Sequence, residues 1–146
     1  MLIDANLLLF ASNVRSPFHS VAHAWLSEQL NGTRRVAMPW QSLGAFARIA
    51  TQARAWEKPM EPDEAWQYIK EWLANDLVWT PTPSEHHGEI LGELVNRYQL
   101  RGNLILDAQL AALAIEHGIE VCSADTDFAR FTEVRWHNPL AKSSPR

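Results

Sequence analysis

Short apolar runs and longer segments of helical spacing alternate along the whole chain. The apolar runs predict five short strands, at residues 2–4, 36–38, 77–79, 119–123 and 134–136. The segments between them mostly carry apolar residues three and four positions apart, which is typical of helices with one buried face. Because parallel strands need a crossover that returns the chain to the same edge, this alternation favours a mainly parallel sheet covered by helices. The pattern therefore predicts an α/β fold.

Capping residues and helix breakers predict where the helices begin and end. Five helices are expected, with start and stop signals at Ser16-Pro17 and Gly32, at Pro39, at Pro62-Asp63, at Ser84 and Gly102, and at Asn103 and Gly118. The apolar stripe of the last helix includes Leu106, so we expect that side chain to face the core.

Tryptophan is frequent in this chain, with seven residues. Trp25, Trp66 and Trp72 fit the core faces of their predicted helices, and we expect them to be packed inside. Trp40 and Trp56 flank the helix that follows the second strand, where packing and a partner interface explain them equally well.

Length and composition narrow the class of protein. A chain of 146 residues suits one domain, which we place at residues 1–140, followed by a flexible polar tail at 141–146. No apolar run is long enough to cross a bilayer and the start has no signal-peptide pattern, so a cytoplasmic protein is expected. The single cysteine, Cys122, excludes an internal disulfide and lies in an apolar run that indicates a buried structural side chain.

Acidic side chains follow two of the predicted strands. Asp4 ends the first strand, and Asp125 comes directly after the fourth. If those strands are neighbours, both acids project into the crevice at the carboxyl ends of the strands, where ligands bind in open parallel sheets. Asp107 falls in the first turn of the last helix, where the helix dipole favours negative charge.

Clustered carboxylates repel one another, and a bound divalent cation removes that conflict. Ligands that are all oxygen select magnesium or manganese, which can bind phosphate although the net charge of the chain is −4. We therefore expect Asp4, Asp107 and Asp125 to be catalytic metal ligands. Asn6 is expected to support them, and Asp127 to cap the following turn or to lie outside the ligands.

Simpler roles exist for the same residues. Each acid taken alone is equally well explained as a cap or a turn residue, and only their joint placement at strand ends favours a metal site. His19 and His23 lie one helical turn apart, but solvated side chains explain them better than a zinc site does.

Three segments together resemble the PIN-domain ribonucleases, in particular the VapC toxins of bacterial type II toxin–antitoxin modules. They are MLIDANLLLF at the start, GNLILDAQLAALAIEHG at residues 102–118 and SADTDFARF at residues 123–131. The resemblance implies a three-layer α/β/α domain with a five-stranded parallel sheet. It also implies hydrolysis of RNA phosphodiesters with Mg²⁺ or Mn²⁺ held by acids, silencing by a VapB-like antitoxin, and pairing as a homodimer.

One position departs from that family's pattern, in which the helix after the second strand carries a glutamate. No acid lies between Glu28 and Glu57, and Ala45 takes the corresponding position, with Gln41 one turn earlier. The site is then expected either to hold one metal ion firmly and recruit a second with substrate, or to be weakly active or substrate-selective.

Three functions remain to be compared. The leading hypothesis is a metal-dependent endoribonuclease toxin. The alternative is a catalytically weak or inactive PIN-like module that binds RNA or protein. A phosphoaspartyl enzyme ranks low, because a second aspartate two residues after Asp4 is missing. Four arginines are candidates to steer phosphate, Arg15, Arg48, Arg54 and Arg101.

Overall fold

Five short parallel strands form the centre of the molecule. A computed structural model describes residues 1–53 and 57–142. The strands lie in the order β3 (Val78–Trp79), β2 (Val36–Ala37), β1 (Leu2–Ile3), β4 (Val121–Cys122) and β5 (Trp136–His137), and every neighbouring pair is parallel. The parallel sheet predicted from the alternating pattern is confirmed.

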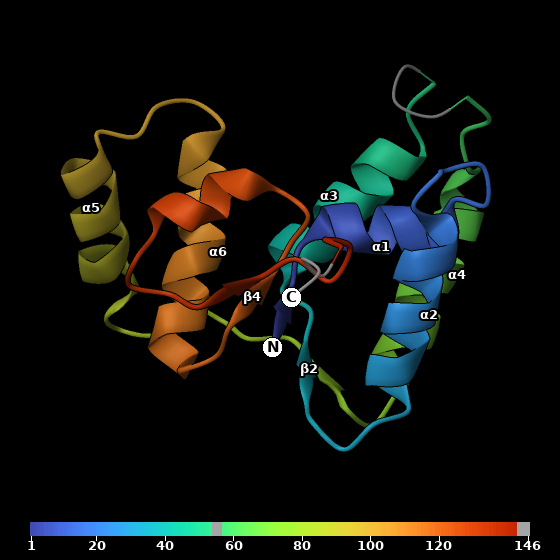
Figure 1. Cartoon of the computed structure of the whole chain (residues 1–146), viewed down its shortest axis with the longest axis horizontal. Helices are drawn as coiled ribbons and strands as arrows, with labels where there is room; N and C mark the ends of the chain where they lie inside the picture. The colour runs from blue at the N-terminus through green and yellow to red at the C-terminus, as the bar shows by residue number, and fades with distance from the viewer. Residues whose placement is uncertain (54–56, 143–146) are drawn as a thin grey trace.

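Helices cover both faces of this sheet. Figure 1 shows one group on one side and the other group opposite. The first group is α1 (Ala5–Ser12), α2 (His19–Leu30), α3 (Trp40–Ala50) and α4 (Pro62–Leu73), and the second is α5 (His87–Tyr98) and α6 (Leu104–His117). A 3₁₀ helix, η1 (Thr126–Arg130), follows β4. The fold is a three-layer α/β/α domain, as expected.

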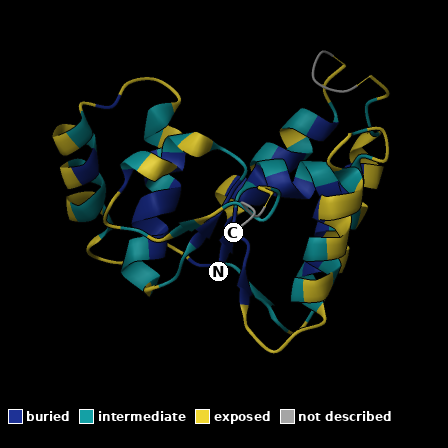
Figure 2. Ribbon diagram, viewed as in Figure 1, coloured by how far each residue is buried: buried dark blue, intermediate teal, exposed yellow. Residues whose placement is uncertain are grey.

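Alternating strand residues divide the interior into two hydrophobic cores. Ile3 and Cys122 pack with α1 to α4, whereas Leu2 and Val121 pack with α5 and α6. This division follows from the pleat, because successive side chains of a strand point to opposite faces. Figure 2 shows the buried residues along the sheet and the helix faces that touch it, with exposed residues on the outer faces. None of the described helices is long and apolar enough to span a bilayer.

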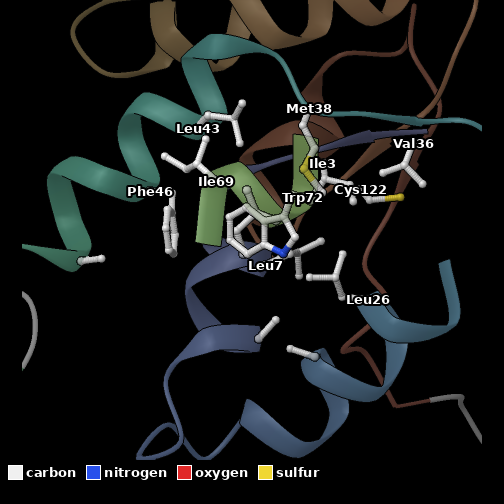
Figure 3. Close-up of a cluster of buried hydrophobic side chains, with 14 of the residues drawn as sticks. Ile3, Leu7, Leu26, Val36, Met38, Leu43, Phe46, Ile69, Trp72 and Cys122 are labelled. Atoms are coloured by element: carbon white, nitrogen blue, oxygen red, sulfur yellow. The ribbon is translucent and has the colours of Figure 1, made fainter. Parts of the chain in front are cut away.

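An aromatic cluster joins α3 to α4 in the larger core. Phe46 is fully buried, and its ring centroid lies 4.9 Å from that of Trp72 and 6.1 Å from that of Tyr68, both in edge-to-face geometry. Figure 3 shows Phe46 and Leu43 pointing from α3 toward the side chains of α4. The cluster fixes the position of α3, which forms one wall of the site described below.

Three local predictions were wrong. Helix α1, which begins directly after Asp4, was not among the five helices expected, because most of its residues are apolar and show no helical period. Trp66 is 54% exposed and stacks on Trp40, with ring centroids 6.4 Å apart, instead of entering the core. Leu106 is 56% exposed because it lines an open groove. Trp56 and the end of the tail lie outside the described residues.

Helix ends differ slightly from the predicted signals. α5 ends at Tyr98 and is closed by Gln99, which takes the left-handed conformation with φ 51°, so Gly102 belongs to the turn before α6. Gly118 ends α6 as expected, with φ 65°. Glycine suits that position because an L side chain is strained there.

Candidate metal centre

The acids after β1 and β4 come together because these two strands are neighbours. Leu2 and Ile3 pair with Val121 and Cys122, and the backbone N–H of Asp4 continues the ladder by donating to the carbonyl of Cys122 at 3.0 Å. The side chains that follow both strands therefore leave the sheet at the same edge. The expectation that the first and fourth strands are adjacent is confirmed.

Asp4 is fixed by hydrogen bonds to both of its carboxylate oxygens. Oδ1 accepts from the backbone N–H of Ala5 at 2.7 Å, which caps α1, and Oδ2 accepts from the hydroxyl of Ser123 at 2.7 Å. Asn6 donates from Nδ2 to Ser123 Oγ at 3.1 Å and accepts from Ala124 N–H at 3.3 Å. The amide of Asn6 thus ties α1 to the loop after β4.

Ser123 is the residue whose role the sequence did not reveal. Its side chain is fully buried, donates to Asp4 and accepts from the N–H of Asp125 at 3.0 Å. One hydroxyl therefore orients the carboxylate of Asp4 and anchors the backbone of Asp125. The only signal in the sequence was its position, directly after a strand and two residues before Asp125.

Three carboxylates form the tightest acidic group in the described part of the chain. Oxygens of Asp107, Asp125 and Asp127 lie within 4.8 Å of one another. Asp125 also caps η1 by accepting from the N–H of Asp127 at 2.8 Å, so the capping role expected for Asp127 belongs to Asp125. Asp127 instead accepts from Arg130 Nη2 at 3.2 Å.

Asp4 lies outside that trio but shares a groove with two of its members. The groove has a volume of about 450 Å³, and its acidic residues are Asp4, Asp107 and Asp125. The opposite wall comes from α3, and it includes the position at which a glutamate is absent, Ala45. The structure thus places that position in the groove, where an acid side chain would face the other carboxylates.

The acids of the groove raise one another's affinity for protons. Burial and the carboxylates of Asp125, Asp4 and Asp127 raise the pKa of Asp107 to about 7, with Arg130 opposing the rise. Burial also raises the pKa of Asp4, assisted by Asp125, while the hydrogen bonds from Ser123 and Ala5 oppose it. A raised pKa means that the ionised groups destabilise one another, and a bound cation reverses that effect.

The donor set fits a hard divalent cation. The cluster offers carboxylate oxygens only, which magnesium and manganese prefer, whereas zinc and copper select nitrogen and sulfur. Other candidate groups do not form such a set in the described residues. His19 Nδ1 lies 3.0 Å from the carbonyl oxygen of Phe10, and burial raises the pKa of Cys122 to about 12, which agrees with a structural thiol.

The raised pKa of Asp107 predicts how stability depends on pH in the absence of metal. Between the ordinary value of 3.8 and about 7 the folded state holds a proton that the unfolded state releases. The stabilisation is therefore fully present below pH 4 and is lost as the pH rises through about 7. In EDTA, we expect the unfolding free energy of the wild type, minus that of Asp107→Asn, to become smaller as the pH rises over that range, because only the wild type has a carboxyl group that ionises at this position. Urea unfolding at several pH values measures it, and a flat difference contradicts the account.

Comparison with protein families identifies the fold. The profile of the PIN domain matches residues 1–134. Ribonuclease VapC37 of Mycobacterium tuberculosis is 38% identical over 140 residues, which cover 96% of this chain and 97% of that protein. Ribonuclease VapC33 of the same species is 39% identical over 137 residues, covering 94% of this chain and 96% of that protein.

Solved structures agree with the sequence comparison. VapC20 of Mycobacterium tuberculosis, a toxin that cleaves the sarcin–ricin loop, superposes with a TM-score of 0.67 at 20% identity, covering 92% of this chain and 98% of that one. The VapBC-1 structure of nontypeable Haemophilus influenzae gives a TM-score of 0.69 at 16% identity, covering 96% and 98%. At these identities the structures show the shared fold, and the sequence matches show the family. The chain belongs to the PIN-domain family and groups within it with the VapC ribonucleases.

Proposed function

We propose that this protein is a Mg²⁺- or Mn²⁺-dependent endoribonuclease that acts as the toxin of a type II toxin–antitoxin system. The observation that carries the proposal is the group of carboxylates that meet at the strand ends of a PIN fold and share one open groove. Relatives that match over nearly the whole chain are named VapC ribonucleases, which supports the same activity. An RNA substrate also fits a cytoplasmic site of action.

The proposed metal ligands are Asp4, Asp107 and Asp125, with Asn6 and Asp127 as supports. A divalent ion bound there would polarise the phosphodiester and lower the pKa of a water molecule, so that water could hydrolyse the RNA without a covalent enzyme intermediate. The chain holds these ligands in place before substrate arrives. Asp4 is held by its backbone hydrogen bond to Cys122 and by its side-chain contacts with Ala5 N–H and Ser123, and the backbone of Asp125 is held by Ser123. The supporting role of Asp127 agrees with its position, because one of its carboxylate oxygens lies within 4.8 Å of oxygens of Asp107 and Asp125.

A metal-dependent cleavage assay tests the proposed activity. The purified protein should cut single-stranded RNA in Mg²⁺ or Mn²⁺, stop when EDTA is added and recover when metal is restored. The second candidate function is an inactive RNA-binding module, which the alanine at position 45 of the groove favours. If the protein binds RNA but does not cleave it with either Mg²⁺ or Mn²⁺, it is such a binding module and the proposed ribonuclease activity is wrong.

A VapB-like antitoxin is the proposed partner, and a homodimer the proposed assembly. Structural neighbours include VapBC2 of Rickettsia felis bound to a promoter fragment, a complex of toxin and antitoxin. A small reading frame beside the gene for this chain, whose product relieves growth inhibition when both are expressed, supports the partnership. Growth inhibition that no neighbouring product relieves counts against it.

A further inference from the structure

The two walls of the acidic groove carry opposite charge. Acids come from the strand ends and from α6, whereas the residues of α3 that line the groove include no acid and one cation, Arg48. Gln41, Ala45 and Arg48 are spaced four and three residues apart, which places them on one face of α3. The aromatic cluster behind α3 holds this face toward the groove.

Arg48 is the guanidinium that lines the groove, and no carboxylate of the described residues pairs with it. Within residues 1–53 and 57–142, ion pairs occupy Arg15, Arg34, Arg97 and Arg130, and Arg35 lies over the ring of Trp79. Arg48 takes part in none of these interactions and is exposed. Of the four arginines considered from sequence, Arg15 pairs with Glu57, Arg54 lies outside the described residues, and Arg101 does not line the groove.

We propose that Arg48 is a positioning residue that binds a phosphate of the RNA strand opposite the acids, while Gln41, about two helical turns away on the same face of α3, offers a neutral hydrogen-bonding group to the same strand. The proposal rests on the proposed function, since it concerns how that substrate is held. A phosphate between the walls meets cationic charge from both sides once the acids hold a metal ion. A planar guanidinium can donate two parallel hydrogen bonds to phosphate oxygens, which fixes orientation as well as charge.

The small side chain between these two residues fits the same arrangement. Ala45 contributes neither charge nor a hydrogen-bonding group to the α3 wall, so the groove stays open at its level. An acid there would add negative charge beside the guanidinium and draw it away from phosphate. Ala45 in place of a glutamate, and Arg48 without a carboxylate partner among the described residues, therefore suit one arrangement, in which the wall of α3 binds substrate and the opposite wall binds metal.

The test compares Arg48→Gln with Arg34→Gln in the full chain. Both changes remove one positive charge. Arg34, however, pairs with Glu120 at the amino ends of β2 and β4, whereas the acids of the groove lie at the carboxyl ends of the strands. Three quantities are measured for each variant. They are kcat and KM for RNA cleavage in Mg²⁺, the salt dependence of binding to a labelled single-stranded RNA oligonucleotide in Ca²⁺, and Mn²⁺ affinity without RNA by tryptophan fluorescence.

We expect Arg48→Gln to lower kcat/KM by about 10- to 100-fold, the effect of losing a charged hydrogen bond. The slope of log affinity against log salt should fall by about 0.7, the value for one phosphate contact to a single strand. Mn²⁺ affinity should stay unchanged, Arg48→Lys should recover part of the activity, and Arg34→Gln should match the wild type.

Equal slopes and equal kcat/KM in the two variants overturn the proposal. So does a loss of Mn²⁺ affinity in Arg48→Gln, because Arg48 then acts through the metal site and not on RNA. If the wild type binds RNA without cutting it, the proposed enzyme is wrong, whereas a smaller salt slope in Arg48→Gln alone still shows the phosphate contact. The two failures are thus distinguishable.

Discussion

Replacing Asp4 with asparagine is expected to abolish RNA cleavage while leaving the fold intact. A metal ion contributes several kcal/mol to such a reaction, so losing a ligand should lower kcat by roughly a thousandfold or more. Asparagine has nearly the same shape, but its one oxygen can accept from the N–H of Ala5 or from the hydroxyl of Ser123 and not from both, so one present hydrogen bond is lost at a cost of about 1 kcal/mol. Removal of a partly buried charge with a raised pKa also relieves repulsion.

A matched control separates this effect from a general loss of charge. Asp76→Asn makes the same chemical change at an exposed position just before β3, at the opposite edge of the sheet. Cleavage rate, growth inhibition on expression and thermal unfolding should be measured for both variants. Toxicity retained by Asp4→Asn, or an equal loss in Asp76→Asn, excludes Asp4 from the reaction.

Truncating Phe46 to alanine should produce the largest loss of stability of any change considered. A fully buried phenylalanine that is replaced by alanine typically lowers the free energy of unfolding by about 3–5 kcal/mol. Here the ring also makes edge-to-face contacts with Tyr68 and Trp72, so the cavity opens between α3 and α4. Because α3 forms the wall that carries Arg48, cleavage should weaken even in the molecules that remain folded.

Urea unfolding measures that loss, and the exposed phenylalanine provides the control. Phe18 is 49% exposed and contacts Phe10 at a centroid distance of 5.1 Å, so Phe18→Ala should cost less than about 1.5 kcal/mol. Equal losses in the two variants show that the α3–α4 cluster does not hold the wall in place.

Much of the architecture could be predicted from the sequence, because buried faces of strands and helices appear as apolar residues at regular spacing. The three inner strands, β2, β1 and β4, are buried on both faces and appear as short apolar runs, and the helices between strands show apolar stripes. Helix α1 was not predicted, because most of its eight residues are apolar and they show no helical period. Trp66 and Leu106 fit an apolar stripe, but periodicity does not reveal which stripe residues lie at an open edge.

The site was predictable in part. Asp4, Asp107 and Asp125 were expected to gather because strand ends and a helix start share one edge of the sheet, and the structure brings them into one groove. The finer geometry depends on side-chain direction, which sequence does not specify. The buried hydroxyl of Ser123, the pairing of Asp127 with Arg130 and the position of Arg48 opposite the acids all required the folded structure.

Calorimetric titration of Mn²⁺ into the metal-free protein at pH 7.5 tests the central claim most directly, because the claim is that these acids hold a divalent cation. The wild type should show saturable binding, and Asp107→Asn should bind at least roughly tenfold more weakly, since a charged ligand is lost. Asp76→Asn should bind like the wild type. Absence of saturable binding in the wild type, or equal binding in Asp107→Asn, contradicts the account.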